Sequence, residues 1–316
     1  MEEKIENIAS PVAKDILKTE LTKERFLRTT NKAENEIYIV NFNDSPNLVR
    51  EIGRLREISF RLSGGGTGKN IDLDEYDTGQ DPYNQLIVWD PSEEEIVGGY
   101  RFKVCSKACV AGTEIKGLAT TKMFRFSKKF IDEYLPYTIE LGRSFVQPAF
   151  QPSHGNRKSI FALDNLWDGL GALIVDHANT RHFFGKVTMY KHFNQQARDI
   201  ILFFFKKFFP DKDKLVEPFN PVLIQSPVER LEKLFGTGSI EENYKILVQE
   251  VRNFKENIPP LINSYVNLCY KMRSFGTAIN EGFGGVEETG ILVSYQDILK
   301  SKRERYCQTY IEWKAL

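Results

Sequence analysis

The chain has 316 residues, of which 41% are hydrophobic and 27% charged, a composition typical of a globular protein with a full hydrophobic core. Its 43 lysines and arginines balance 43 aspartates and glutamates, so no overall attraction to nucleic acid is expected. No apolar run approaches the roughly 20 residues of a membrane-spanning helix, and the first residues lack the basic and apolar pattern of a secretory signal. We therefore expect a cytoplasmic protein that binds no nucleic acid.

The four cysteines and four histidines do not have the spacing of a metal site. Cys105 and Cys109 are separated by three residues, whereas a zinc knuckle has two between its cysteines. The histidines also lack an H-E-x-x-H pattern. We expect free thiols and no bound metal.

The N-terminal part of the chain shows little periodicity, and residues 1–40 are expected to form a helical or loose arm. Ser45 and Pro46 mark the start of a helix, with serine as the N-cap and proline at the first helical position. Its buried face is predicted from apolar residues at intervals of three and four: Leu48, Val49, Ile52, Leu55 and Ile58. The segment Ser-Gly-Gly-Gly at 63–66 ends this helix.

Two β-rich runs, at 85–89 and 96–104, flank the turn sequence Asp90-Pro91-Ser92 and predict a hairpin. The elements expected after it are a strand at 137–146, a helix at 159–177, a strand at 182–189, mainly helices at 191–260, a helix at 260–271 and a strand at 290–295. This order predicts one α/β (α+β) domain over 41–316, with a helical elaboration at about 191–272.

The segment 63–70, Ser-Gly-Gly-Gly-Thr-Gly-Lys-Asn, has the glycine content of a phosphate-binding loop. However, Ser63 and Asn70 stand where a Walker loop has glycine and a hydroxyl residue, and the segment follows a helix instead of a strand. We interpret it as a flexible loop that becomes ordered over a substrate.

Charged residues in the first helix and the loop after it suggest a functional site. Arg56 and Phe60 lie four residues apart and project from one side of the helix. Asp74 and Asp77 belong to an acidic run in the following loop. Each residue alone also has an ordinary explanation as a solvated or ion-paired side chain.

Further charged residues lie on the predicted strands. Arg101 follows a glycine pair on the second hairpin strand, and Glu140 and Arg143 lie on the third strand. Strand alternation places Glu140 and Arg143 on opposite faces of a sheet, unless Gly142 marks a bulge.

In this order the motifs resemble the acyl-carrier-protein-dependent branch of the GNAT acyltransferase superfamily. The chain is similar to the N-acyltransferases that begin ornithine-lipid and glycine-lipid synthesis, sometimes labelled hemolysins, and more distantly to acyl-homoserine-lactone synthases. The matching segments are Arg56-x3-Phe60, Asp72-x-Asp74-x2-Asp77, Arg101, Glu140-Leu-Gly-Arg143, Leu166-Trp167-Asp168-Gly169, Phe183-Phe184-Gly185, Pro259-Pro260-Leu261-Ile262 and the residues from Gly290 to Ser294.

The resemblance implies a GNAT-like mixed, mainly antiparallel sheet flanked by helices. It also implies transfer of a long-chain acyl group from acyl carrier protein to the α-amino group of glycine or ornithine, with the acyl-phosphopantetheine thioester as co-substrate and no tightly bound cofactor. The turn at 151–157 has one glycine where the pantetheine-binding turn usually has two, which favours an acyl carrier protein donor over coenzyme A. The alternatives are a coenzyme A-dependent acetyltransferase acting on a small amine and a non-enzymatic, membrane-active protein.

Roles in acyl transfer can be suggested for the charged residues. Glu140 acts as the base or orients the ammonium group, or it is only a structural partner of Arg143 or Arg101. Arg101 and Arg143 are expected to anchor the acceptor carboxylate, because guanidinium groups bind carboxylates with matched geometry. Asp74 and Asp77 are expected to have a different role, in which they pair with Arg56 and shape a lid.

The donor is expected to enter where strands of the sheet splay apart. Backbone N–H groups near Phe145, Val146 and Gln147 are candidates for binding the pantetheine amide and polarising the thioester carbonyl. The residues expected to hold the phosphate, unless they form a simple polar loop, are Gly155, Asn156 and Arg157.

An aromatic cluster at 203–209 contains Phe203, Phe204, Phe205, Phe208 and Phe209 around two lysines. It is a candidate wall of an acyl tunnel or a patch that contacts the inner membrane surface. The favoured interpretation is the buried face of a core helix.

Overall fold

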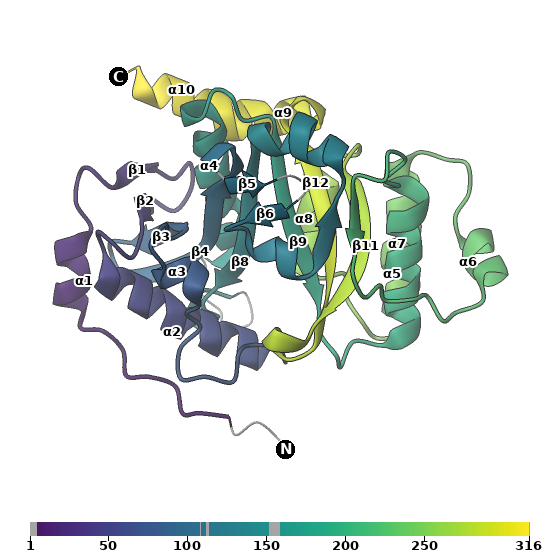
Figure 1. The fold of residues 1–316 in the computed structure, drawn as a ribbon, viewed down its shortest axis with the longest axis horizontal. Coiled ribbons are helices and arrows are strands. Elements are labelled where there is room, and N and C mark those ends of the chain that lie inside the picture. Colours follow the sequence, from purple (N-terminus) through teal and green to yellow (C-terminus); the bar gives the residue numbers. More distant parts are fainter. Residues whose placement is uncertain (1–4, 108, 112–113, 152–158, 316) are drawn as a thin grey trace.

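The computed structural model describes residues 5–107, 109–111, 114–151 and 159–315. An eight-stranded sheet with the order β1-β2-β3-β4-β8-β9-β12-β11 forms its centre (Figure 1). Neighbouring strands are antiparallel except β8 and β9, which are parallel. The strands of this sheet are β1 Phe26–Thr29, β2 Glu36–Val40, β3 Asn84–Asp90, β4 Glu95–Val104, β8 Thr138–Val146, β9 His182–Met189, β11 Arg273–Asn280 and β12 Val286–Ser294.

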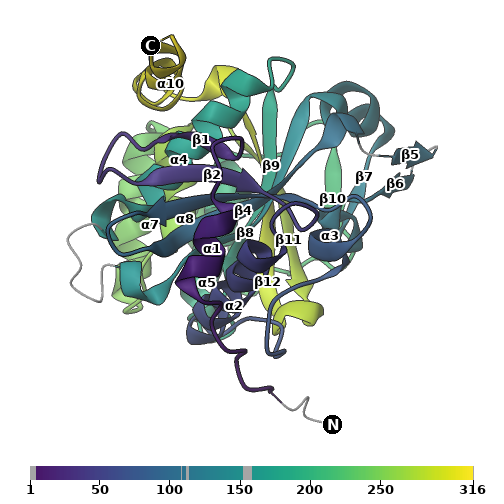
Figure 2. The same cartoon turned by 90° about the vertical axis from the view of Figure 1, so that its left-hand side faces the viewer.

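Helices and a smaller layer of strands cover the two faces of the sheet. One face packs against α4 Ser159–Asp176, α5 Gln195–Phe208, α7 Ile240–Asn253 and α8 Pro260–Leu268, and the main hydrophobic core lies between them. The other face packs against α2 Pro46–Leu62 and against the excursion between β4 and β8. In Figure 2 the helices α4, α7 and α8 lie on one side of the strands and α3 Glu75–Thr78 on the other.

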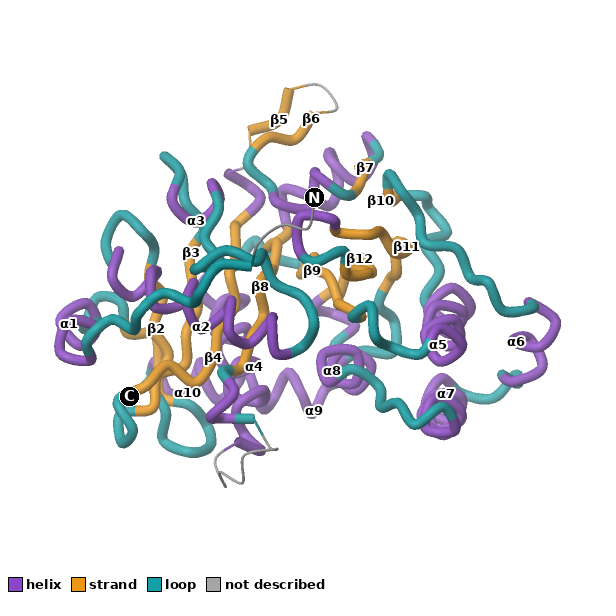
Figure 3. The backbone as a smooth tube through the Cα atoms, turned by 90° about the horizontal axis from the view of Figure 1, so that it is seen from below, coloured by secondary structure: helices purple, strands orange, loops and turns teal. Residues whose placement is uncertain are grey.

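The remaining elements are short. Two pairs of strands stand outside the main sheet: β5 Cys109–Ala111 with β6 Glu114–Lys116, and β7 Phe124–Phe126 with β10 Val216–Pro218. Helix α6 Val228–Leu234 lies beside α5 and α7 beyond the β11 edge (Figure 3). Helices α9 Lys300–Arg303 and α10 Thr309–Lys314 end the chain. The sequence thus predicted the mixed, mainly antiparallel sheet flanked by helices, while β11 and the C-terminal helices were not predicted.

The expected N-terminal arm over residues 1–40 is wrong for its second half. After α1 Lys14–Glu20, strands β1 and β2 join the main sheet, and β2 pairs with β3 along its full length. Ile37 and Val40 are fully buried there. This segment also contacts α2, because the carboxylate of Glu20 accepts hydrogen bonds from Asn47 N and Leu48 N at 3.2 and 2.7 Å.

That contact corrects the expected helix cap. The Ser45 side chain makes no capping hydrogen bond, and its hydroxyl donates to Asp44 Oδ1 at 2.7 Å. A glutamate distant in sequence therefore satisfies the exposed N–H groups that a helix start leaves free. The boundaries of α2 nevertheless agree with the apolar periodicity, and the predicted hairpin is confirmed as β3 and β4.

The aromatic cluster on α5 belongs to the core. Phe203, Phe204, Phe205 and Phe209 are between 0% and 7% exposed, and Phe208 packs against the same core. The interpretation as a core helix is confirmed, because the side chains pack against Phe235 and Tyr244, and these buried rings form no membrane-facing patch. Among the described residues no helix combines the length and apolar character needed to span a membrane.

Candidate active site

The parallel strands β8 and β9 pair over three residues each and then separate. Thr138, Ile139 and Glu140 pair with His182, Phe183 and Phe184, and no pairing is found beyond Glu140 within this described part of the sheet. A pocket whose interior and mouth together enclose about 650 Å³ lies where the strands diverge. Its lining from these strands comprises Glu140, Leu141, Gly142, Arg143 and Ser144 of β8 with Lys186 and Thr188 of β9.

A bulge in β8 forms part of this pocket. Gly142 pairs with Arg101 and Phe145 with Gly99, so β8 has one residue more than β4 between these pairs. The predicted bulge is confirmed, but the residue with positive φ is Arg143, at +49°. Because a bulge interrupts strand alternation, Arg143 reaches the same face as Arg101 and Glu140 instead of following Leu141.

Two glycines of β4 allow the strands to approach closely beside the bulge. A Cβ atom on Gly98 would lie 2.4 Å from the carbonyl oxygen of Phe145, and one on Gly99 would lie 2.7 Å from that of Leu86. Both distances are too short for any other residue. The glycine pair before Arg101 is therefore a packing requirement of the strand and contributes to the site only by positioning Arg101.

Three arginines and three aspartates form a buried ion cluster below the pocket. Arg56 is fully buried, and its Nη2 lies 2.8 Å from Asp77 Oδ2 while its Nε lies 3.0 Å from Asp72 Oδ2. Arg101 Nη1 lies 2.7 Å from Asp74 Oδ1 and 3.0 Å from Asp77 Oδ2. Burial would raise the pKa of Asp77, but the guanidinium groups of Arg56 and Arg101 outweigh it and hold that pKa below its ordinary value.

This cluster assigns partners to the predicted residues. The pairing of Asp77 with Arg56 is confirmed, whereas Asp74 pairs with Arg101 and also caps α3 through Tyr76 N and Asp77 N. Arg101 is 3% exposed and its Nη1 is shared between two carboxylates, which favours a structural role over binding of an acceptor.

Arg143 joins the cluster from the edge of the pocket. Its Nε lies 2.9 Å from Asp72 Oδ2, and its guanidinium carbon lies 4.2 Å from the centre of the Phe283 ring. Phe283 also contacts Phe60 with ring centres 5.0 Å apart, so the predicted Phe60 lines the pocket as well. With a side chain 14% exposed, Arg143 is the arginine of the cluster that still faces solvent.

Glu140 is held in a fixed orientation at the point where the strands separate. Its Oε2 accepts a short hydrogen bond from the Tyr83 hydroxyl, and its Oε1 accepts one from Thr120 N at 2.9 Å. The Tyr83 oxygen in turn accepts a hydrogen bond from Ala119 N at 2.9 Å. Burial and the negative charge of Glu140 raise the pKa of Tyr83 well above its ordinary value, so the phenol remains a donor.

These contacts contradict the alternative in which Glu140 is only a structural partner of Arg143 or Arg101. Its hydrogen bonds go to Tyr83 and Thr120, and the nearby arginines pair with aspartates. The carboxylate thus lines the pocket, and no lysine or arginine of the described residues forms an ion pair with it. No sequence pattern predicted Tyr83, which lies 57 residues from Glu140 and directly before β3.

A second ion pair lines the pocket opposite the arginine cluster. Lys186 Nζ on β9 lies 2.6 Å from Glu288 Oε2 on β12, and this oxygen also accepts a hydrogen bond from Asn280 Nδ2 at 2.8 Å. Burial of Glu288 opposes ionisation, but Lys186, Asn280 and Arg143 outweigh it and lower the pKa of this carboxyl. Neither residue was predicted, because Glu288 lies before residue 290, where the last strand was expected to begin, and the contact of Lys186 with it depends on the pairing of β9 with β12.

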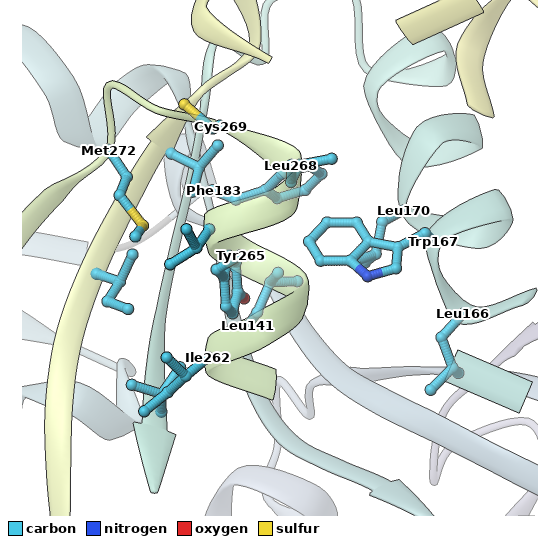
Figure 4. Packing of buried hydrophobic residues seen from close by; sticks show 14 of the residues in the cluster. Leu141, Leu166, Trp167, Leu170, Phe183, Ile262, Tyr265, Leu268, Cys269 and Met272 are labelled. Carbon is cyan, nitrogen blue, oxygen red and sulfur yellow. The ribbon is translucent and has the colours of Figure 1, made fainter. Parts of the chain in front are cut away.

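The two halves of the pocket lie on opposite faces of the sheet. On the face with Glu140 and Lys186, which also carries the arginine cluster, the lining of the pocket is mainly polar and charged. The other face contributes Leu141, Tyr100, Leu261 and Tyr265, which belong to the main core. Figure 4 shows Tyr265 of α8 beside Leu141. The pocket therefore passes through the sheet from a charged side to an apolar side.

The structure describes only some of the residues that were expected to hold pantetheine. Gln147 N donates to Val97 O at 3.0 Å, so this group does not face the opening. Phe145 packs in the cluster with α2, and Val146 lies against the main core. Gly155, Asn156 and Arg157 lie outside the described residues.

The glycine-rich loop at 63–70 does not border the pocket, contrary to expectation. The carboxylate of Glu57 accepts hydrogen bonds from Thr67 N at 3.0 Å and Gly68 N at 2.8 Å, which fix the loop against α2. The residues that line the described pocket come from elsewhere in the chain.

Residues 55–158 match the family described as "Acetyltransferase (GNAT) domain". Two relatives, from Phocaeicola vulgatus and Bacteroides thetaiotaomicron, are each named glycine N(alpha)-acyltransferase. Each is 53% identical over 308 residues, which cover 98% of this chain and 94% and 91% of the respective relatives.

A solved structure of a CoA-dependent acyl-homoserine lactone synthase with SAM and isopentyl-CoA also aligns with the chain. It covers 87% of this chain and 89% of its own at 10% identity, with a TM-score of 0.38. At that score the likeness carries no argument about the reaction.

Proposed function

The chain belongs to the GNAT N-acyltransferases, and from this premise we propose that it transfers a long-chain acyl group from an acyl-phosphopantetheine thioester to the α-amino group of glycine. The observation that carries the proposal is the pocket that passes through the sheet. Its charged half suits an amino acid, and its apolar half suits a fatty acyl chain. The name of the two relatives supports glycine over ornithine as the acceptor.

The acceptor binds on the charged face in this proposal. Arg143 and Lys186 border the pocket from β8 and β9 and attract the acceptor carboxylate, while Glu140 receives the amino group. Burial of a doubly charged amino acid requires such paired charges, because unpaired charges are costly to remove from water. The Tyr83 and Thr120 hydrogen bonds keep the Glu140 carboxylate aimed at its ligand before the acceptor arrives.

The reaction is a direct attack of the amine on the thioester. Glu140 takes a proton from the ammonium group, and the neutral nitrogen forms a C–N bond with the thioester carbonyl carbon. As the tetrahedral centre collapses, the C–S bond breaks and the amine loses its second proton. The pantetheine sulfur leaves as a thiolate, which takes up a proton to become the free thiol. No side chain of the enzyme forms a covalent bond.

The donor proposed here is an acyl carrier protein, because the turn at 151–157 departs from the usual pantetheine-binding pattern. Coenzyme A is the alternative carrier of the same phosphopantetheine arm. Both present an identical thioester to the pocket, so the choice depends on contacts outside it. A location at the inner membrane surface, where an acylated amino acid would enter the lipid phase, is part of the same proposal.

The test is to incubate purified protein with hexadecanoyl thioesters of acyl carrier protein and of coenzyme A, each with a panel of amino acids. Thiol release gives the rate, and mass spectrometry identifies the amide. We expect N-hexadecanoylglycine, formed faster from the acyl carrier protein. Exclusive use of short acyl groups from coenzyme A, or a product with another amine, would refute the proposal.

A further inference from the structure

We propose that Gly142 limits the size of the acceptor, because the space left by its missing side chain holds the α-carbon of glycine. Gly142 lines the pocket from β8 and pairs with Arg101 of β4. Residues that pair across an antiparallel sheet project to the same face, so a side chain at position 142 would lie on the charged face. This inference rests on the proposed function, because it concerns the acceptor that the function requires.

The fold itself gives no reason for a glycine at this position. Gly142 does not have a positive φ, since the residue of the bulge with a left-handed backbone is Arg143. A Cβ atom on Gly142 would have no atom within 4 Å among the described residues outside its chain neighbours. By contrast, Cβ atoms on Gly98 and Gly99 would lie 2.4 and 2.7 Å from carbonyl oxygens. Open space, and not close packing, therefore surrounds Gly142.

A glycine that the backbone does not require is unfavourable in a strand. It loses more conformational freedom on folding than any other residue, and it has no side chain to pack. Alanine at position 142 would avoid part of this cost without a clash. The gap beside Gly142 opens on the pocket that this residue lines, which points to a ligand as its occupant.

The residues beside Gly142 on β8 match the two ends of an acceptor amino acid. Glu140 lies two residues before Gly142 on the same face, and Arg143 follows Gly142 and reaches that face through the bulge. In the proposed reaction Glu140 receives the amino group and Arg143 attracts the carboxylate. The atom that joins these two groups is the α-carbon, and the residue between their binding partners is Gly142.

An aromatic ring bounds the space beside Arg143. Phe283 lines the pocket and is 3% exposed, and its ring centre lies 4.2 Å from the guanidinium carbon of Arg143. Phe60 contacts this ring edge to face, with the two planes at 72°. A carboxylate bound to Arg143 lies next to the Phe283 ring, which leaves little room for a side chain on the acceptor. The charged half of the pocket therefore favours glycine over alanine and larger amino acids.

The test adds a methyl group to the space beside Gly142. We expect Gly142→Ala to lower kcat/KM for glycine about ten-fold or more, the effect of one methylene group in a fitted site. KM for the hexadecanoyl thioester should change much less, and the midpoint of urea unfolding should not fall. The control is Gly236→Ala, between α6 and α7, where the nearest described atom lies 4.0 Å from the Cβ position and φ is not positive. Gly236 does not line the pocket, so kcat/KM should stay unchanged.

A graded variant separates the effect of size from an effect on the fold. Gly142→Val has a larger side chain that suits a strand, and it should lower kcat/KM for glycine more than Gly142→Ala does. If both folded variants acylate glycine as the wild-type protein does, the inference fails and the proposed function stands. A fall of the urea midpoint in parallel with activity would also overturn the inference, because position 142 would then serve the fold. If the wild-type protein forms no N-hexadecanoylglycine from either carrier, the inference and the proposed function both fail.

Discussion

The two charged regions of the pocket differ in how completely their charges are paired. In the arginine cluster, Arg56 and Asp77 are fully buried and each carboxylate contacts more than one guanidinium group. Lys186 of the Lys186–Glu288 pair has a side chain 12% exposed, close to the 14% of Arg143 at the edge of the cluster. Charges that are fully buried and paired favour a structural role, whereas a cation whose side chain is still partly exposed favours ligand binding. The difference separates residues that build the site from residues that contact its ligands.

The largest effect is expected where pairing is most complete. Arg56→Met leaves the carboxylates of Asp72 and Asp77 buried with one cation fewer, which should lower the free energy of unfolding by about 3–5 kcal/mol. Urea denaturation followed by circular dichroism measures this. As the control, Lys128→Met removes a lysine that pairs with Asp132, where both side chains are more than half exposed, and should cost less than about 1 kcal/mol. Equal losses in the two variants would contradict a scaffold role for the cluster.

Glu140 lies between the two charged regions, and its substitution tests the chemical step instead of stability. Glu140→Gln keeps the shape and a hydrogen-bond acceptor for Thr120 N but removes the base, so kcat should fall about 100-fold to 10,000-fold. Single-turnover measurement with saturating thioester isolates this step. Tyr83→Phe removes a hydrogen bond to Glu140 while leaving the carboxylate, and a smaller loss is expected. A Glu140→Gln enzyme with nearly normal kcat would leave this residue only an orienting role.

The Lys186–Glu288 pair should affect binding of the acceptor and not of the donor. We expect Lys186→Met to raise KM for glycine about ten-fold to a hundred-fold, the loss of one charged hydrogen bond, with a smaller change for the thioester. Glycinamide provides the sharpest comparison because it lacks the carboxylate. The variant and the wild-type enzyme should have similar kcat/KM for glycinamide if Lys186 binds that group. A parallel loss for both acceptors would show that Lys186 only supports the fold.

The smallest effect is expected at the closed end of the β8–β9 pair, away from the charged regions. Burial and the charges of Arg181 and Arg273 lower the pKa of His182 to about 4, so the unfolded chain binds a proton more readily than the folded one. The associated stability is present above pH about 6.5 and is lost as the pH falls toward 4. For a partly exposed ring we expect about 1–2 kcal/mol.

Denaturation midpoints between pH 4 and 7 measure this effect, with His182→Asn as the comparison. Asparagine can keep a hydrogen bond to Ser294, as the histidine does at 3.0 Å, but it does not titrate. The difference between the two proteins should therefore vary with pH in this range. A constant difference would show that the ring does not change its proton uptake on folding.

Local patterns predicted the long elements, and the site required contacts that local patterns do not contain. The apolar spacing of α2 and the turn at Asp90 determined their elements. Strands β1 and β2 have only four and five residues, and their place in the sheet depends on the pairing of β2 with β3. Arg56 and Asp77 were predicted as partners because both lie near one loop. Lys186 and Glu288 were not predicted, because their contact depends on β9 and β12 being neighbours in the sheet.

The backbone of Arg143 has a consequence for engineering of the enzyme. An L-residue at φ +49° is strained by roughly 1–2 kcal/mol, which glycine would not be. Arg143→Gly would relieve this strain, and Asp72 would still pair with Arg56. The same change would remove a cation that borders the acceptor. Position 143 is thus a point where selection for thermal robustness and selection for turnover favour opposite residues, and a stabilised but slow variant is the expected result of optimising the first alone.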